Sequence, residues 1–229
     1  MKLLLFDIDG TLLRVAETGR QILQEALADI VGGPVNTDGI RFSGRTDLPI
    51  IREVLIKSGY SSVEADRLLP AAAQAYCDFG MEILDRPDSV HVLPGVFDLL
   101  AALSDRSDVT LGLLTGNLRN MAYAKLKAAG LDAYFPFGAF GSDHEERSKR
   151  PPVALGQAEA HTGRSFRGKD IVIIGDTEFD VLCGRALGVF AVAVATGRFS
   201  RTYLAAYEPD LLLDNLQNVE GFLNVVVES

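Results

Sequence analysis

Carboxylate, hydroxyl and amide side chains directly follow three apolar runs of this sequence. These residues are Asp7, Asp9, Thr115, Gly116, Asn117, Asp176 and Asp180. Asp7 and Asp9 are two residues apart, so an extended chain turns both carboxylates to the same side. Four carboxylates in one cleft would repel one another and take up protons unless a cation lay between them. The pattern therefore predicts a cation site.

The types of these side chains indicate which ion and which group the site would bind. Hard oxygen ligands suit Mg²⁺, which takes one or two carboxylates, keeps several waters and also binds substrate phosphate. Thr115 supplies a hydroxyl where a helix begins, and the amides and positive dipole end of that helix favour an anion. A basic residue is needed to balance the phosphate, and Arg147, Lys149 and Arg150 precede the helix that Pro151 opens. We therefore expect a Mg²⁺ site that binds a phosphate group.

Short apolar strands alternate with helical patterns over most of the chain. The expected strands are 3–7, 110–114, 171–174 and 189–194, with a weaker one at 211–213. The expected helices among them are 96–103, 118–129, 151–161 and 179–187. This alternation implies parallel strands joined by right-handed crossovers. The predicted fold is a doubly wound α/β sheet, in which ligands bind at the carboxyl ends of the strands.

Residues 14–90 interrupt this alternation. Three helical patterns, 18–30, 47–57 and 63–84, follow one another there with no strand pattern among them. Pro70 is expected to kink or divide the third of these helices. We therefore expect a core domain of residues 1–13 and 91–229, with a small α-helical domain of residues 14–90 inserted after the first strand.

The composition excludes several classes of partner. The 229 residues include 22 Lys and Arg against 31 Asp and Glu, a formal net charge of −9, which argues against binding to a nucleic-acid backbone. No apolar run approaches the roughly 18 residues that cross a bilayer. Asp7 and Asp9 end the initial apolar run before it reaches the length of a signal peptide. We expect a cytoplasmic protein without membrane or nucleic-acid partners, either a monomer or a homodimer.

Four motifs in this order resemble those of the haloacid dehalogenase-like (HAD) hydrolase superfamily. They are DIDGTL at 7–12, LTGN at 114–117, Lys149 before two prolines, and IGDT at 174–177 followed by Asp180. Together they cover residues 3 to about 200, nearly the whole chain. The helical insertion lies between the first two motifs, as in members that carry a helical C1 cap over a Rossmann-like core. The loop FSGRTD at 42–47 looks like the cap loop that reaches the substrate in phosphoglycolate phosphatase-like members, which makes Arg45 a candidate substrate-binding residue.

The resemblance implies a catalytic role for the first motif. Asp7 would be the nucleophile that forms an aspartyl-phosphate. Asp9 would be the general acid for the leaving alcohol and then the base that activates water. The Mg²⁺ ligands would be the Asp7 carboxylate, the Asp9 backbone carbonyl and Asp176. Asp180 would order the waters of the ion or Lys149.

The resemblance also implies a set of phosphate-binding groups. These are Gly10, Thr115, Gly116, Asn117 and Lys149. Thr115 and Lys149 would act on the phosphoryl oxygens, where the transition state gathers charge. The usual Lys-Pro pair is Lys149-Arg150 here, so Arg147 is an alternative phosphate-site cation.

The leading hypothesis is a Mg²⁺-dependent phosphatase that acts on a small phosphorylated metabolite, with phosphoglycolate as a first candidate by resemblance alone. Asp9 argues against a haloacid dehalogenase, which lacks this second acid. The position of Lys57 argues against a phosphonatase, which needs a cap lysine in the site. A β-phosphoglucomutase-like phosphomutase is the nearest alternative. A non-catalytic phosphate-binding regulatory protein is another, although the presence of both Asp7 and Asp9 argues against it.

Overall fold

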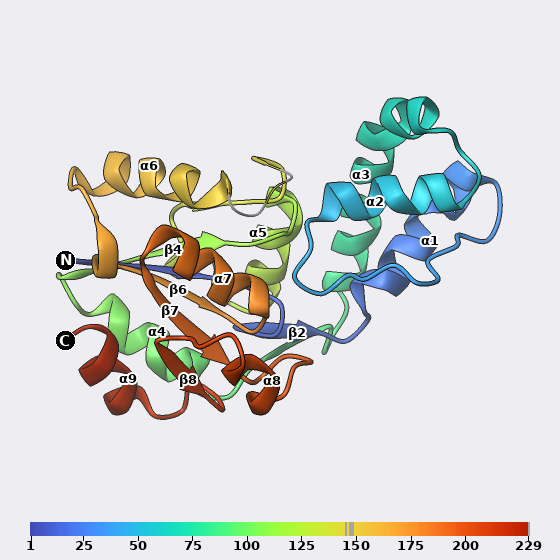
Figure 1. Ribbon diagram of the computed structural model, residues 1–229. Helices are drawn as coiled ribbons and strands as arrows, with labels where there is room; N and C mark the ends of the chain where they lie inside the picture. The colour runs from blue at the N-terminus through green and yellow to red at the C-terminus, as the bar shows by residue number, and fades with distance from the viewer. Residues whose placement is uncertain (145, 147–148, 229) are drawn as a thin grey trace.

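A parallel six-stranded sheet forms the centre of the computed structural model, which describes residues 1–144, 146 and 149–228. The strands lie in the order β5-β4-β1-β6-β7-β8 (Figure 1). Their bounds are β1 Lys2–Phe6, β4 Val109–Leu114, β5 Gly138–Ala139, β6 Ile171–Gly175, β7 Phe190–Val194 and β8 Leu211–Leu213. After β1, the next strands along the chain, β4 and β5, lie on one side of it, and β6, β7 and β8 lie on the other. The strand order therefore reverses at β1. Such a reversal marks the place where ligands bind in sheets of this type.

Helices cover both faces of the sheet, which confirms the predicted doubly wound α/β fold. Alternate residues of β1 explain the two layers, because Leu4 and Phe6 pack into one apolar cluster and Leu3 and Leu5 into another. The first cluster includes residues of α4 Val96–Ser104, α5 Arg119–Ala128 and α9 Val219–Val226. The second includes residues of α6 Arg150–Thr162 and α7 Glu178–Leu187. Among the described residues, shorter helices include α8 Arg201–Ala205 and the 3-10 turns Asp132–Tyr134 and Gly168–Asp170.

Three short strands were not predicted from the sequence. β5 has two residues, too few to show a period. β2 Leu13–Val15 and β3 Val90–Val92 pair antiparallel and join the two chain crossings that flank the helical segment. The division of the chain after residues 13 and 90 stays a prediction, and this ribbon lies across both positions.

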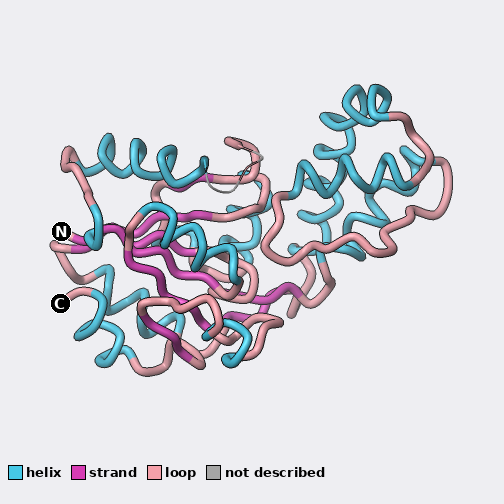
Figure 2. Tube along the Cα trace, viewed as in Figure 1, coloured by secondary structure: helices cyan, strands magenta, loops and turns pink. Residues whose placement is uncertain are grey.

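The helical segment, residues 19–84, contains α1 Gly19–Val31, α2 Asp47–Lys57 and α3 Ser62–Leu84 (Figure 2). Pro70, which is predicted to kink or divide the third helix, does not divide it, because α3 continues through it. Buried residues on both sides of Pro70, such as Ala65 and Tyr76, belong to one apolar cluster with α1 and α2. Tertiary packing therefore offsets the lost backbone hydrogen bond. In the part of the chain that the structure describes, no helix is both long and apolar enough to cross a bilayer.

The segment from Arg41 to Asp47, which leads into α2, is attached to the sheet at two points. Arg41 forms an ion pair of 2.5 Å with Glu178, at the start of α7. At the other end, the Asp47 amide donates to the Gly116 carbonyl at 3.0 Å, and the Leu118 amide donates to Asp47 Oδ2 at 2.8 Å. The helical segment is thereby held against the carboxyl ends of β4 and β6.

Burial gives the Asp47 carboxyl group an unusual affinity for its proton. The loss of solvation raises the pKa of Asp47 to about 6, even though Lys125 and the Leu118 amide both act to lower it. An aspartate with a raised pKa in the folded state makes folding less favourable as pH rises through the interval between the unfolded and folded values.

We expect the substitution Asp47→Asn to change the pH dependence of stability. The asparagine oxygen can still accept from the Leu118 amide, but no buried charge forms. The free energy of unfolding of the variant, relative to the original protein, should rise by up to about 3 kcal/mol between pH 4 and pH 7. Urea titrations in EDTA at a series of pH values measure this difference.

The control for this experiment is Asp29→Asn, on the exposed side of α1. Its side chain is exposed, so this variant controls for the replacement of an aspartate that no neighbouring element buries. A difference for Asp47→Asn that stays constant with pH, or falls as pH rises, would contradict the assignment of a buried, proton-retaining carboxyl group.

Candidate active site

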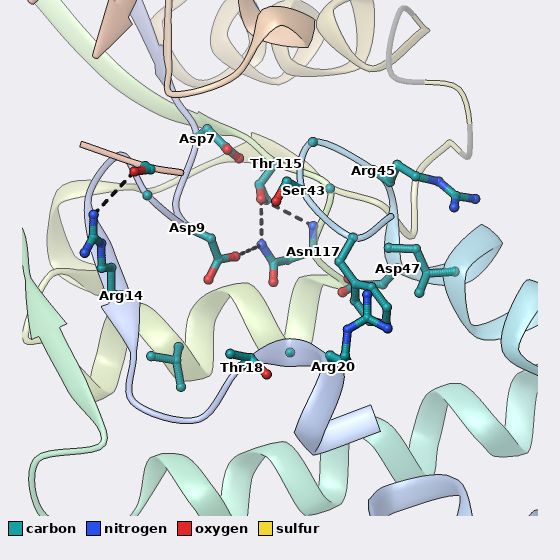
Figure 3. A pocket seen from close by; sticks show the side chains of 18 of the residues that line it. Asp7, Asp9, Arg14, Thr18, Arg20, Ser43, Arg45, Asp47, Thr115 and Asn117 are labelled. Carbon is teal, nitrogen blue, oxygen red and sulfur yellow. Dashed lines mark hydrogen bonds between the residues drawn. The ribbon is translucent and has the colours of Figure 1, made fainter. Parts of the chain in front are cut away.

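A cavity of about 640 Å³ lies between the carboxyl ends of the central strands and the helical segment. Figure 3 shows Asp7, Asp9, Thr115 and Asn117 on the sheet side of this cavity and Thr18 and Arg20 on the opposite side, whereas the Arg45 side chain extends away from these residues. The predicted site residues that line it are Asp7, Asp9, Gly10, Arg45, Thr115, Gly116, Asn117 and Asp176. Parallel pairing explains this convergence, since β1 lies directly between β4 and β6.

Three carboxylates form a buried cluster at one end of the site. Oxygens of Asp7, Asp176 and Asp180 lie within 4.8 Å of one another, and each residue is at least nine-tenths buried. Asp7 directly follows β1, Asp176 directly follows β6, and Asp180 lies in the first turn of α7. Gly10 lets the backbone after Asp9 pass close to the Asp176 carboxylate. Its φ is +83°, and a Cβ there would lie 2.5 Å from Asp176 Oδ2.

The chemistry of this cluster fits a hard divalent cation. The ligand atoms are all oxygens, and three negative charges at this separation would repel one another strongly if no cation were bound. Mg²⁺ needs few protein carboxylates and binds phosphate readily. Asp180 also accepts hydrogen bonds from the Thr177 amide and hydroxyl at 3.1 and 2.7 Å, which fixes its carboxylate at the start of α7.

The Asp9 carboxylate is connected to Thr115 through a single amide group. Asn117 Nδ2 donates to Asp9 Oδ2 at 2.7 Å and to Thr115 Oγ1 at 2.8 Å (Figure 3). The Asn117 backbone amide also donates to Thr115 Oγ1, at 3.3 Å. Both contacts use lone pairs of the hydroxyl oxygen, so its hydrogen remains able to donate to a phosphoryl oxygen.

Lys125 is a site residue that the sequence analysis missed. Its ammonium group donates to both oxygens of Asp9, at 2.8 and 2.7 Å, and to Asn117 Oδ1 at 2.6 Å. The residue is 5% exposed and lines the cavity. Lys125 lies in α5, whereas Asn117 precedes that helix and Asp9 is 116 residues away, so no local pattern connects them.

The basic residues before Pro151 take different positions. Arg150 is fully buried, and its guanidinium donates to the Thr115 carbonyl and, at 3.1 Å, to Thr46 Oγ1. Lys149 has a side chain that is 55% exposed and pairs with Glu146 at 3.0 Å, outside the set of cavity residues. Arg147 lies outside the described residues. The phosphate-site role of Lys149 thus stays a prediction.

Several arginines of the described residues also line the cavity. They are Arg14, Arg20, Arg45 and Arg198. Arg45 pairs with Glu53 at 2.7 Å, and its backbone carbonyl passes so close to Gly116 that a Cβ there would lie 2.3 Å from it. Tyr76 also lines the cavity, where burial raises the pKa of its hydroxyl well above the usual value. The arginines bring positive charge to the cavity, which Glu17 and Asp47 also line.

Comparisons with known proteins agree with this geometry. The family model described as haloacid dehalogenase-like hydrolase matches residues 4–194. Phosphoglycolate phosphatase from Synechococcus elongatus is 30% identical over 218 residues, which are 93% of each chain. Pyrophosphatase PpaX from Listeria monocytogenes is 26% identical, over 94% of this chain and 93% of its own.

A solved structure supports the same fold. The crystal structure of a predicted phosphoglycolate phosphatase from Haemophilus somnus superposes with a TM-score of 0.73 at 20% identity, over 97% of each chain. At that identity the likeness concerns the fold. Together with the match of the family model and the site at the strand ends, it confirms the predicted family: this chain belongs to the haloacid dehalogenase-like hydrolases.

Proposed function

We propose that this protein is a Mg²⁺-dependent phosphatase that hydrolyses a small phosphorylated metabolite through an aspartyl-phosphate on Asp7. The observation that carries the proposal is the buried group of Asp7, Asp176 and Asp180, placed beside Thr115 at the end of a cavity. Two relatives that align over most of their length are named phosphoglycolate phosphatase and pyrophosphatase. Both names describe the hydrolysis of a phosphorylated small molecule.

In the first step, Asp7 attacks the phosphorus atom, and the bond from phosphorus to the leaving oxygen breaks. Asp9 gives its proton to that oxygen, so the alcohol leaves neutral. In the second step, water attacks the aspartyl-phosphate, its proton passes to Asp9, and Asp7 is released together with inorganic phosphate. Thr115 and the Gly116 amide bind the phosphoryl oxygens where negative charge develops.

Asp7, Asp176 and Asp180 are the carboxylates that would hold Mg²⁺, and the Asp9 backbone carbonyl is proposed as a further ligand. When bound, the ion neutralises part of the charge of the phosphate and of these carboxylates. Because the three carboxylates are buried close together, the ion would also lower their mutual repulsion.

The arginines that line the cavity support a substrate with a second anionic group, and phosphoglycolate is the first candidate. The substrate's phosphate would lie next to Asp7 and Thr115. Its carboxylate would extend towards Arg45 and the other arginines of the cavity.

The substitution Asp7→Asn tests the nucleophile. With Mg²⁺ and p-nitrophenyl phosphate, turnover should fall by at least about a thousandfold, about 4 kcal/mol of transition-state stabilisation, while the circular dichroism spectrum is retained. The exposed Asp29→Asn variant serves as the matched control and should keep its rate. Rates close to those of the original protein in Asp7→Asn would rule out an aspartyl-phosphate on this residue.

Removal of the metal tests the carboxylate cluster. EDTA should abolish turnover, and added Mg²⁺ should restore it. Thermal denaturation gives a readout independent of activity: Mg²⁺ should raise the melting temperature because it relieves the repulsion among buried carboxylates. In Asp176→Asn this rise should need at least about tenfold more Mg²⁺. A melting temperature that does not respond to Mg²⁺ would contradict a metal site at these residues.

The substitution Arg45→Gln tests whether the cavity binds a second anionic group of the substrate. The KM for 2-phosphoglycolate should rise about tenfold, whereas kinetics with p-nitrophenyl phosphate, which lacks a second anion, should change little. Arg52→Gln is the control, because Arg52 pairs with Asp66 on the outer side of the helical segment. Equal effects of Arg45→Gln on the two substrates would show that Arg45 does not bind a second anionic group of the substrate.

A further inference from the structure

We infer that Lys125 is a positioning residue for Asp9 in its role as the base of the second step. Its ammonium group contacts both Asp9 oxygens, at 2.8 and 2.7 Å. This inference rests on the proposed function, in which Asp9 is the base. Lys125 is given a role through Asp9 and not through a contact with substrate.

The contacts around Asp9 hold its carboxylate in one orientation. Lys125 and Asn117 both direct N–H donors at its oxygens. An ammonium group has only donors, so contacts of this kind hold a carboxylate in one orientation through charge-assisted hydrogen bonds. The acceptor in the second step is therefore oriented before water arrives.

Lys125 also determines the orientation of Asn117. Because the ammonium group can only donate, its contact of 2.6 Å selects the oxygen of the Asn117 amide. The Asn117 nitrogen then faces Asp9 and Thr115. One cation thus aligns the base with the hydroxyl proposed to bind the phosphoryl group.

The position of Lys125 makes this alignment rigid. The Lys125 side chain comes from α5 and is 6% exposed, whereas the Asp9 side chain is 46% exposed and would otherwise be free to turn in the cavity. A charged group that is this well buried needs partners, and its described partners are the Asp9 carboxylate and the Asn117 amide oxygen.

The consequence falls on one chemical step. In the second step, the bond from water oxygen to phosphorus forms while the bond from Asp7 oxygen to phosphorus breaks, and the Asp9 carboxylate accepts the water proton. An ester with a good leaving group, such as p-nitrophenyl phosphate, phosphorylates Asp7 without needing the proton of Asp9. Loss of Lys125 should therefore slow dephosphorylation and spare phosphorylation by this ester.

The test is rapid mixing of Lys125→Met with p-nitrophenyl phosphate and Mg²⁺. We expect a burst of p-nitrophenol at the rate of the original protein. Turnover per active site after the burst should be about tenfold or more slower, and acid quenching should recover more phosphoenzyme. The burst amplitude counts the active sites, so the turnover per active site can be compared even if part of the variant is unfolded. Lys127→Met, an exposed lysine on the same helix, should behave like the original protein.

Two outcomes with Lys125→Met would overturn the inference. One is the absence of a burst together with no increase in phosphoenzyme. The other is a burst rate that falls in proportion to the later turnover, as expected for a purely structural residue.

Asp9→Asn separates this inference from the proposed function. If Asp9→Asn keeps the original turnover per site after the burst, the base assignment fails, and the role of Lys125 fails with it. If Asp9→Asn is slow in the second step while Lys125→Met is not, only the role of Lys125 fails. The double variant should be as slow as Asp9→Asn alone, and an additional loss would show that Lys125 acts independently of Asp9.

Discussion

Repulsion among three buried carboxylates is the constraint on which the organisation of this protein depends. Asp7, Asp176 and Asp180 come from two neighbouring strand ends and the first turn of a helix, and their oxygens lie within 4.8 Å. The sheet positions them at a free-energy cost, which the buried strands and the two helical layers must exceed. A bound cation would offset that cost and at the same time create a place for a phosphate group.

Positive charge is distributed around the cavity in a way that matches this constraint. Lys125 lies against Asp9, Arg150 supports the backbone at Thr115, and several arginines line the cavity. A protein with a net charge of −9 can therefore present a locally favourable surface to an anion. The overall charge bears on classes of partner such as nucleic acid, while local placement bears on chemistry.

The helical segment completes the site because its loop is attached directly to the ends of the strands. The amide of Asp47 and the carbonyl of Gly116 are hydrogen-bonded, and Arg41 pairs with Glu178 next to Asp176. The same loop carries Arg45, so the group proposed to select the substrate is held in register with the group proposed to bind its phosphate. Packing at Gly116 leaves no room for a side chain between them.

The sequence by itself determined the doubly wound fold and the residues at the strand ends, because apolar runs and the acids that follow them are local patterns. Asp7, Thr115 and Asp176 lie at one edge as a consequence of parallel pairing. Only the tertiary structure placed Lys125 against Asp9, 116 residues away, and Arg150 against Thr115. It also kept α3 continuous through Pro70. These features depend on which helix packs against which strand. That packing joins residues far apart in the sequence, so no local pattern predicts it.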